Sequence, residues 1–261
     1  MKKLPKVAII CANYNYGDYI EAAMESVLGF QTYKGEIRLY VVDDGSTDDS
    51  WEKISSICYF KDKDPFGNPM VNTVEEITDN VLFRKRIKNS GASVARNVAI
   101  EMCWDWADII GVLDADDAYY PEKVEKLVAK LVEHEEIGVA YADYENVFPE
   151  YRKTEFKDSF NRDGLAQNCM VHSNALIKKK YLNMVRLENG EFYKSSLHGP
   201  ASEVFIGCTE DYDLWLRLST ICVFCHVPEV LGVANQHGRN QSMKMTTEIF
   251  KENAKRLGGR Q

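Results

Sequence analysis

The chain has 261 residues, of which 45% are hydrophobic and 28% charged, and its formal net charge at pH 7 is −8. This length and composition predict one globular domain, or one domain with a smaller lobe. The negative charge argues against a broad nucleic-acid-binding surface, so no nucleic-acid partner is expected.

Localisation and redox state follow from the apolar runs and the cysteines. No apolar run approaches the roughly 20 residues that span a bilayer, and the N-terminal stretch MKKLPKVAIICANYN is too briefly apolar for a signal peptide. We therefore expect a cytoplasmic protein, in which the seven cysteines are reduced thiols. The segment CVFCH at 222–226 matches the pattern of c-type haem attachment, but that attachment usually follows export. We expect a structural strand there, and no zinc site, because no second cysteine pair of this kind exists.

Strand and helix patterns alternate along the first part of the chain. Apolar, β-rich runs predict strands within 6–15, 37–44, 81–87, 107–117 and 137–147. Apolar residues at helical spacing predict helices within 19–30, 46–54, 93–103 and 121–135. Gly29 is expected to stop the first helix, Ser46 or Thr47 to cap the second, and Pro121 to occupy the first position of the fourth.

The remaining segments are less regular. Residues 58–80 contain prolines and a glycine and predict a long loop or insertion. The polar stretch 150–164 is typical of a loop, 210–219 predicts an amphipathic helix, and 247–261 predicts a charged helix that frays into glycines. Alternating strands and helices predict an α/β fold with a mixed, mainly parallel sheet flanked by helices. Ligands bind such sheets at the carboxyl ends of the strands, where both acidic clusters of the sequence fall.

The acidic cluster DADD follows the predicted strand at 107–117. Asp114, Asp116 and Asp117 fall within this four-residue stretch, and like charges this close repel one another unless something neutralises them. Two carboxylates one residue apart can hold Mg²⁺ or Mn²⁺, which favour oxygen ligands and need few from the protein when substrate phosphates supply the rest. A solvated acidic turn is the alternative, and it is the commoner explanation of an isolated D-x-D.

Two earlier loops carry candidate donor-binding residues. Asp43 and Asp44 end the second predicted strand. They either form an acidic turn ahead of a helix or hold the N3–H of a uracil or thymine ring, which Gly45 would let approach closely. Tyr14 has a ring that can lie against a flat base, and Asn15 can fix the first loop, although Tyr-Asn is also an ordinary turn sequence.

A cation and a second acidic pair complete the candidates. Arg96 can pair with Asp43 or Asp44, or reach a phosphate, and a purely structural ion pair is equally compatible with its position. Glu210 and Asp211 open the amphipathic helix, where the helix dipole favours acids. To act as a base, one of these carboxylates must lie within hydrogen-bond reach of an acceptor hydroxyl.

The order of these motifs is more specific than any one of them. YN, VDDGSTD, GxSxARN, DADD followed by Pro, and EDYDLWLR, in this order, resemble glycosyltransferase family 2, the inverting nucleotide-sugar transferases of the GT-A fold. The resemblance is dense over 6–130, sparse over 140–205 and present again at 206–242. It implies a single GT-A, Rossmann-like domain over 1–261. Its parts are a nucleotide-sugar-binding half at 1–130, an acceptor-binding half at 131–242 and a helical tail at 243–261.

The resemblance also implies roles for individual residues. The donor-binding residues would be Tyr14, Asn15, Asp43, Asp44, Arg96 and Asp114. Among them, Tyr14 would stack near the base, Asp44 would bind the uracil, and Asp114 would contact the ribose or the donor sugar. Asp116 would ligate Mn²⁺ or Mg²⁺ bridging the diphosphate. Asp211 would be the catalytic base, with Glu210 shaping the acceptor site.

The late segment ANQHGRNQS resembles the family's flexible closing segment. There His237 would contact the metal or the diphosphate, and Arg239 the phosphate. Two departures occur: Asn235-Gln236 stands where the family often has Tyr-Arg, and the usual Pro of the first loop is replaced by Ala12. Neither departure touches an implied metal ligand or the implied base.

The implied reaction moves a sugar from a nucleotide-diphosphate sugar, expected to be a UDP-sugar, to an acceptor hydroxyl in glycan or polysaccharide biosynthesis. Residues 140–205, which would build the acceptor site, fit a glycan, a lipid-linked glycan or a protein loop equally. The lysines at 178–180 fit either peripheral contact with an anionic membrane or a solvated face.

Three other classes compete with the transferase. A haloacid-dehalogenase-type phosphatase also uses D-x-D after a strand, but it normally has Thr or Val where Ala118 stands. A sugar nucleotidylyltransferase needs a glycine-rich first loop with a basic residue, which CANYNYGDY lacks. A non-catalytic nucleotide-sugar-binding module on the same fold stays open.

Overall fold

The computed structural model of the chain describes residues 3–56, 81–165, 169–195, 210–238 and 240. The predicted insertion at 58–80 and the predicted helical tail lie outside these residues, as does Arg239. The strands are β1 (Val7–Asn13), β2 (Ile37–Asp43), β3 (Val81–Arg86), β4 (Ile109–Val112), β5 (Asp117–Tyr119), β6 (Ile137–Val147), β7 (Arg152–Glu155), β8 (Leu176–Lys178) and β9 (Val223–Asn235). The helices are α1 (Ile20–Leu28), α2 (Ser50–Ser56), α3 (Ala92–Cys103), α4 (Lys123–Glu133), α5 (Arg162–Leu165), α6 (Lys179–Met184) and α7 (Glu210–Leu218).

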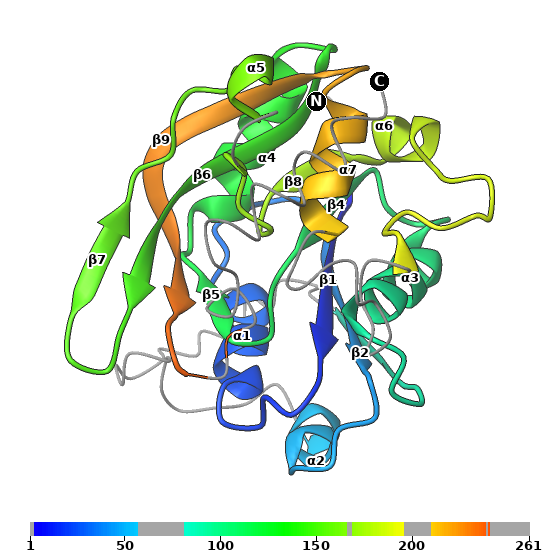
Figure 1. The fold of residues 1–261 in the computed structure, drawn as a ribbon, viewed down its shortest axis with the longest axis vertical. Helices are drawn as coiled ribbons and strands as arrows, with labels where there is room; N and C mark the ends of the chain where they lie inside the picture. Colours follow the sequence, from blue (N-terminus) through cyan, green and yellow to red (C-terminus); the bar gives the residue numbers. More distant parts are fainter. Residues whose placement is uncertain (1–2, 57–80, 166–168, 196–209, 239, 241–261) are drawn as a thin grey trace.

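The described strands form one mixed sheet in the order β3-β2-β1-β4-β8-β6-β9-β5, with β7 beside β6. β1 is parallel to β2 and β4, and β2 is parallel to β3. β8 runs antiparallel to both β4 and β6, and β6 is parallel to β9. β6 and β9 therefore point the same way as β1, and their carboxyl ends reach the same edge of the sheet (Figure 1). A mixed sheet flanked by helices confirms the predicted fold class.

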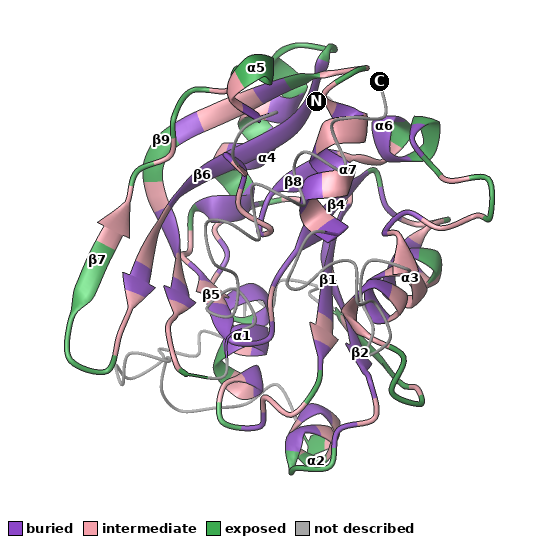
Figure 2. Ribbon diagram, viewed as in Figure 1, coloured by how far each residue is buried: buried purple, intermediate pink, exposed green. Residues whose placement is uncertain are grey.

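The two faces of the sheet bury different side chains of the same strands. In β1, Ala8 and Ile10 pack in the core with Ala95 and Ala99 of α3 and with Trp215 of α7. The alternate residues of β1 face the other core, which α1 and α4 cover. Both faces of β1 are buried, which explains why its sequence is a continuous apolar run rather than an alternating one (Figure 2).

Two predicted helix starts were wrong. α2 begins at Ser50, whose N–H donates to the Asp48 carboxylate at 3.0 Å. Neither Ser46 nor Thr47 caps α2, because the Ser46 hydroxyl is held by Asp43 and by the N–H of Asn15. α4 has Glu122 at its N-cap, so Pro121 precedes the helix instead of opening it.

The polar stretch predicted as a loop contains β7, which forms a hairpin with the carboxyl end of β6, and the short helix α5. β5, β8 and α6 were not predicted, since three to six residues are too few to show a hydrophobic period. The cysteine segment forms a strand, as predicted: β9 begins at Val223, directly after Cys222, and contains Cys225 and His226. The cysteines in the described part of the chain are free thiols.

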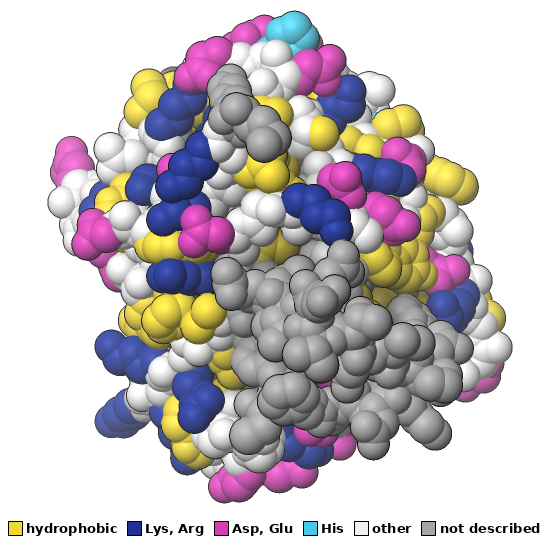
Figure 3. Space-filling model, turned by 180° about the vertical axis from the view of Figure 1, so that it is seen from behind, with side chains coloured by type: hydrophobic (Ala, Val, Ile, Leu, Met, Phe, Trp, Pro, Cys, Tyr) yellow, Lys and Arg dark blue, Asp and Glu magenta, His cyan; other side chains and the backbone are white. Residues whose placement is uncertain are grey.

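The lysines at 178–180 have intramolecular contacts. The Lys178 ammonium donates to the carbonyls of His134 and Glu135, Lys179 donates to the carbonyl of Trp104, and Lys180 pairs with the Glu135 carboxylate. Figure 3 shows basic and acidic side chains interspersed on the face that it presents. Among the helices that the structure describes, none combines the length and the hydropathy needed to cross a membrane.

Candidate active site

The loops that follow β1, β2 and β4 meet at the carboxyl edge of the sheet and carry half of the predicted site residues. Asn15, in the loop after β1, adopts a positive φ of 59°. Its side-chain oxygen accepts the N–H of Thr47 at 2.8 Å, and its own N–H donates to the Ser46 hydroxyl at 2.9 Å. Asn15 therefore fixes the first loop against the second, as predicted. Tyr14 beside it is 44% exposed, so its ring is accessible to a ligand.

The two acids after β2 have different environments. Asp43 is fully buried, accepts from Asn13 at 2.9 Å, and pairs with the guanidinium of Arg86 at 3.2 Å. Asp44 accepts the N–H groups of Ser90 and Gly91 at 2.7 and 2.8 Å, which ties the end of β2 to the start of α3. Pairing with Asp43 or Asp44 was one of the alternatives open for Arg96, and the structure does not show it: Asp43 pairs instead with Arg86 of the edge strand β3.

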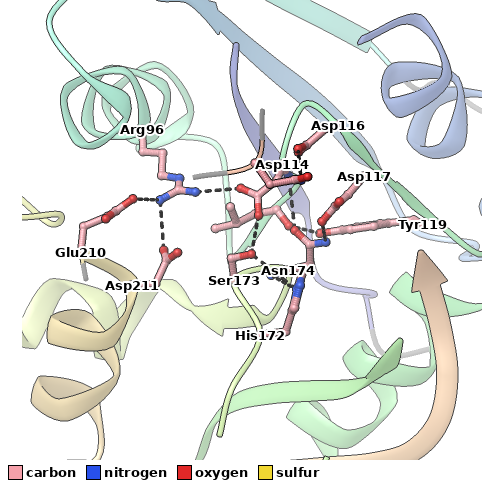
Figure 4. Close-up of polar contacts among 12 residues, drawn as sticks. Arg96, Asp114, Asp116, Asp117, Tyr119, His172, Ser173, Asn174, Glu210 and Asp211 are labelled. Carbon is pink, nitrogen blue, oxygen red and sulfur yellow. Dashed lines mark hydrogen bonds and ion pairs between the residues drawn. The ribbon is translucent and has the colours of Figure 1, made fainter. Parts of the chain in front are cut away.

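Arg96 instead joins the D-x-D turn to helix α7 (Figure 4). One terminal nitrogen of its guanidinium contacts Asp114 at 2.7 Å, and the other contacts Glu210 at 2.9 Å and Asp211 at 3.2 Å. Burial disfavours the charged guanidinium, but these three carboxylates outweigh it and raise the pKa of Arg96 above its usual value. The planar fork of an arginine suits such opposed contacts better than a lysine ammonium does.

Sequence reasoning missed the residues that hold the acidic turn in place. The Ser173 hydroxyl donates to Asp114, and Asn174 accepts the Asp114 N–H at 3.2 Å and donates to Asp117 at 2.8 Å. Burial would raise the pKa of Asp114, but Arg96 and the Ser173 hydroxyl hold it below its usual range. The segment that ends in β8 thus fixes the turn after β4, its neighbour in the sheet.

Asp116 lies apart from the arginine and contacts the late segment. One oxygen of its carboxylate lies 3.1 Å from Nε2 of His237 and 3.0 Å from the side-chain nitrogen of Asn240. Burial, and then the charge of Asp114, raise the pKa of Asp116 to about 7. The His237 ring stacks on Tyr19, with ring centroids 4.6 Å apart. The structure therefore brings together the two side chains that the sequence predicted as metal ligands, although 121 positions separate them.

Asp116 and His237 have side chains that suit a hard divalent cation. A carboxylate oxygen and an imidazole nitrogen point at each other, and both are ligands that Mn²⁺ accepts. Burial and the charge of Asp114 disfavour the ionised form of Asp116, and a cation held beside it would oppose both effects. Among the described residues, no group of three or more His, Cys, Asp or Glu side chains is placed to hold a metal. Most of the ligands would therefore have to come from a substrate or from water.

Asp117 is part of the scaffold of the turn. It begins β5, is 6% exposed, and accepts from Asn174. Burial and the neighbouring Asp116 raise its pKa well above the usual value for a carboxyl. The buried Lys123 lies near it and stacks its ammonium over Tyr119 at 4.1 Å.

The two acids that open α7 differ in accessibility. The Glu210 side chain is 1% exposed, whereas that of Asp211 is 13% exposed. Asp211 is thus the acid of the pair that a second substrate can reach. In Figure 4, Asp211 and Asp116 lie on opposite sides of the contact between Arg96 and Asp114. The site therefore has two carboxylate centres joined through one arginine.

The geometry argues against a phosphatase of the haloacid dehalogenase type. In such an enzyme the first Asp of the D-x-D is the nucleophile, which here is Asp114. One oxygen of Asp114 contacts Arg96 and the other accepts from Ser173, so both oxygens already have partners that would compete with a role as nucleophile. The fold, the D-x-D turn and the acidic start of α7 together define the class of glycosyltransferases with the GT-A fold.

Comparison with known proteins confirms this class. The model of glycosyl transferase family 2 matches residues 8–186, which is more than half of the chain. The chain belongs to this family. It is 26% identical over 259 residues to the chondroitin synthase of Escherichia coli, covering 97% of this chain and 32% of that protein. It is 24% identical to the hyaluronan synthase of Pasteurella multocida, covering 94% of this chain and 22% of that protein. The chain thus spans about a third or less of the length of these relatives.

Solved structures show the same fold. S. aureus TarS residues 1–349, in complex with UDP-GlcNAc, matches with a TM-score of 0.66 at 16% identity, covering 97% of this chain and 65% of that chain. A mannosyltransferase from Pyrobaculum calidifontis, in complex with GDP-Man and Mn²⁺, matches with a TM-score of 0.63 at 14% identity, covering 98% and 65% of the two chains. At these identities the likeness extends to the fold alone.

Proposed function

We propose that the chain transfers a sugar from a nucleotide-diphosphate sugar, with UDP as the nucleotide, to an acceptor hydroxyl. The reaction inverts the anomeric carbon and builds a glycan or a polysaccharide. The observation that carries the proposal is the Arg96 network, in which one guanidinium contacts both Asp114 of the D-x-D turn and Asp211 of α7. A donor sugar bound at Asp114 and a deprotonating Asp211 would thereby lie within the reach of one side chain.

The donor would lie over the loops at the carboxyl ends of β1 and β2. Tyr14, which is 44% exposed, would stack on the base, and Asp44 would bind the uracil. Asp43 and Asn15 act on the donor through the loop, because their contacts with Ser46 and Thr47 hold the two loops together. Asp114, held by Arg96 and Ser173, would contact the ribose or the donor sugar.

Asp116 and His237 would hold Mn²⁺ or Mg²⁺ against the diphosphate. The cation would offset the negative charge that grows on the leaving group as the glycosidic bond breaks. Asp116 must be ionised for this role. Its own surroundings raise its pKa to about 7, and the positive charge of a nearby cation would favour the ionised form. Asp211 has a different role, since it must accept the proton of the acceptor hydroxyl. Attack from the side opposite the leaving group gives inversion in one displacement.

The relatives support the UDP donor and the polymer product. TarS was solved with UDP-GlcNAc, and one partial match, 33% identical over 138 residues, is a UDP-glucose-dependent glucosyltransferase acting on a diphosphoundecaprenol-linked sugar in Escherichia coli. The acceptor of this chain is therefore proposed to be a saccharide, either free or lipid-linked. Peripheral membrane contact through the lysines at 178–180 is a weaker proposal, because those ammonium groups already have intramolecular contacts.

A thermal-shift screen tests the donor proposal. UDP-GlcNAc, UDP-glucose, UDP-glucuronic acid and GDP-mannose are added to the chain with Mn²⁺, with Mg²⁺ or with EDTA. A ligand at 100 times its Kd stabilises the folded chain by about 2.7 kcal/mol, so a specific donor should be visible. We expect a UDP-sugar to raise Tm more with Mn²⁺ than with EDTA, and GDP-mannose to have little effect. Equal shifts for both nucleotides, or no shift, would contradict the proposal.

Product formation separates an enzyme from a binding module on the same fold. The UDP-sugar that binds is incubated with methyl β-glycosides of glucose, galactose, N-acetylglucosamine and glucuronic acid, and the products are read by mass spectrometry. A disaccharide with the new bond inverted relative to the donor is expected. Binding without any product from this panel or from the lipid-linked analogues would favour a non-catalytic module.

A further inference from the structure

Tyr193 lies at the candidate active site and has a buried hydroxyl group that makes no hydrogen bond to the residues that the structure describes. The side chain is 1% exposed, and the hydroxyl has no partner among the described residues. The tyrosine ring lies under the Arg96 guanidinium, whose carbon is 5.3 Å from the ring centroid. No sequence motif singles out this residue.

Hydrogen bonds fix the backbone of Tyr193 to the residue that follows Arg96. Asn97, the next residue of α3, accepts the N–H groups of Phe192 and Tyr193 at 3.1 and 2.8 Å and donates to the Tyr193 carbonyl at 2.7 Å. Because Arg96 and Asn97 are consecutive, the segment that carries Tyr193 is fixed to the same helix turn as the arginine. The position of the hydroxyl is therefore set by the scaffold.

Tyr193 lies among the charges of the active site, with its ring against the Arg96 guanidinium that contacts Asp114, Glu210 and Asp211. After burial, the largest influence on the pKa of Tyr193 is the negative charge of Asp211, followed by Arg96, Asp114 and Glu210, and the net effect is to raise that pKa. The phenol therefore stays protonated at neutral pH and is available as a hydrogen-bond donor. Among the charged groups, the one with the largest influence on this pKa is the carboxylate that we propose as the base.

An unbonded hydroxyl is unusual for a buried tyrosine of this chain. Tyr33 donates to the Pro5 carbonyl at 2.6 Å, Tyr141 to the Asp158 carbonyl at 2.7 Å, and Tyr212 to the Leu165 carbonyl at 2.7 Å. A buried polar group without a partner destabilises a fold, and phenylalanine would fill the same space without that penalty. Within the described part of the chain, the hydroxyl of Tyr193 thus has no structural partner that explains its presence.

We propose that the Tyr193 hydroxyl binds the saccharide acceptor, donating a hydrogen bond to a ring or hydroxyl oxygen next to the hydroxyl that Asp211 deprotonates. This inference rests on the proposed function and adds an acceptor-binding residue to it. A site that hydrogen-bonds a substrate oxygen discriminates strongly against analogues that lack it, because the protein donor is then left unpaired. Tyr193 would therefore contribute to the choice of acceptor and to its orientation, and not to donor binding.

The substitution Tyr193→Phe tests the inference, with Tyr33→Phe as the matched control. Tyr33 is a buried tyrosine whose hydroxyl is bonded at the other end of the sheet. We expect Tyr193→Phe to leave Tm unchanged or raised, to leave the Kd for UDP with Mn²⁺ unchanged, and to lower kcat/KM for the methyl glycoside acceptor about five- to tenfold. Tyr33→Phe should do the reverse, lowering Tm and leaving kcat/KM unchanged.

The outcomes separate this inference from the function on which it rests. If the wild-type chain makes no product from any glycoside, the proposed function fails, and the acceptor role of Tyr193 fails with it. If the wild type is active and Tyr193→Phe has the same kcat/KM, the function stands and the inference is overturned. A large loss of Tm in Tyr193→Phe would also overturn it, by showing that the hydroxyl stabilises the fold through a buried water.

Discussion

Replacing Arg96 tests how strongly one cation holds the active site together. In Arg96→Met, the carboxylates of Asp114, Glu210 and Asp211 lose the guanidinium that contacts them at 2.7, 2.9 and 3.2 Å. Breaking a buried ion pair by removing one partner costs about 3–5 kcal/mol, because the other charge stays buried. We expect Arg96→Met to lose at least that much of its free energy of unfolding.

The substitution Arg96→Lys separates charge from geometry. A lysine keeps the positive charge, but one ammonium cannot replace two nitrogens that contact Asp114 on one side and α7 on the other. Losing one such charge-assisted hydrogen bond costs about 1.5–3 kcal/mol. We therefore expect an intermediate stability, together with a loss of transfer activity, because the D-x-D turn and the proposed base are no longer held together.

Urea denaturation at pH 7 measures these differences, and the slope m checks that the unfolded state is unchanged. Arg152→Met is the matched control: Arg152 pairs with Glu145 at a similar 2.9 Å, but its side chain is 58% exposed. An exposed pair contributes about 0–1 kcal/mol. The reasoning would be refuted if Arg96→Met and Arg152→Met lost the same free energy of unfolding.

Three further predictions concern residues around the site. Burial and the charge of Lys157 lower the pKa of His172 from 6.5 to about 3. Between these two pH values only the unfolded chain binds the proton, so the free energy of unfolding decreases as the pH is lowered through this range. His172→Gln should recover about 2 kcal/mol of the stability lost between pH 8 and pH 5, measured by urea titration at both pH values, whereas His134→Gln on the surface should not. Asn15→Ala should lower the free energy of unfolding by about 1 kcal/mol more than Asn15→Gly, because glycine adopts the φ of 59° without strain and alanine does not. Equal losses in the two variants would contradict this explanation. Ser173→Ala, which frees one oxygen of Asp114, should weaken binding of a UDP-sugar more than binding of UDP, as titration calorimetry would show.

The parts of the fold that could be predicted are those determined by local patterns. β1 and β2 are continuous apolar runs buried on both faces, and α1, α3 and α4 have a clear helical period. The start of α2 could not be predicted from local patterns. The Ser46 hydroxyl bonds to Asp43 and to the N–H of Asn15 instead of capping the helix, and capping rules do not include such contacts. β5 and β8 are short strands whose existence depends on their neighbours in the sheet.

The candidate site divides in a similar way. The acids of the D-x-D and of α7 were predicted from motifs, and the structure brings Asp114 of the first motif and both acids of the second to one arginine. The partner of that arginine stayed open in the sequence, since Arg86 and Arg96 are both cations near the acidic turns and only the fold decides which acid each one contacts. Ser173 and Asn174 carry no recognisable motif, because their role depends on β8 lying beside β4. The only sequence signal for their role was two short polar residues just before β8, a strand that was not predicted.

The central claim is that the two carboxylate centres do different work, and one pair of variants measures this directly. Asp211→Asn and Asp116→Ala are each titrated with UDP in the presence and absence of Mn²⁺, and each is assayed for transfer to the glycoside acceptor. We predict that Asp211→Asn keeps the tighter binding of UDP with Mn²⁺ and loses transfer, whereas Asp116→Ala loses the effect of Mn²⁺ on UDP affinity. Near-normal transfer by Asp211→Asn, or an unchanged effect of Mn²⁺ in Asp116→Ala, would contradict the account.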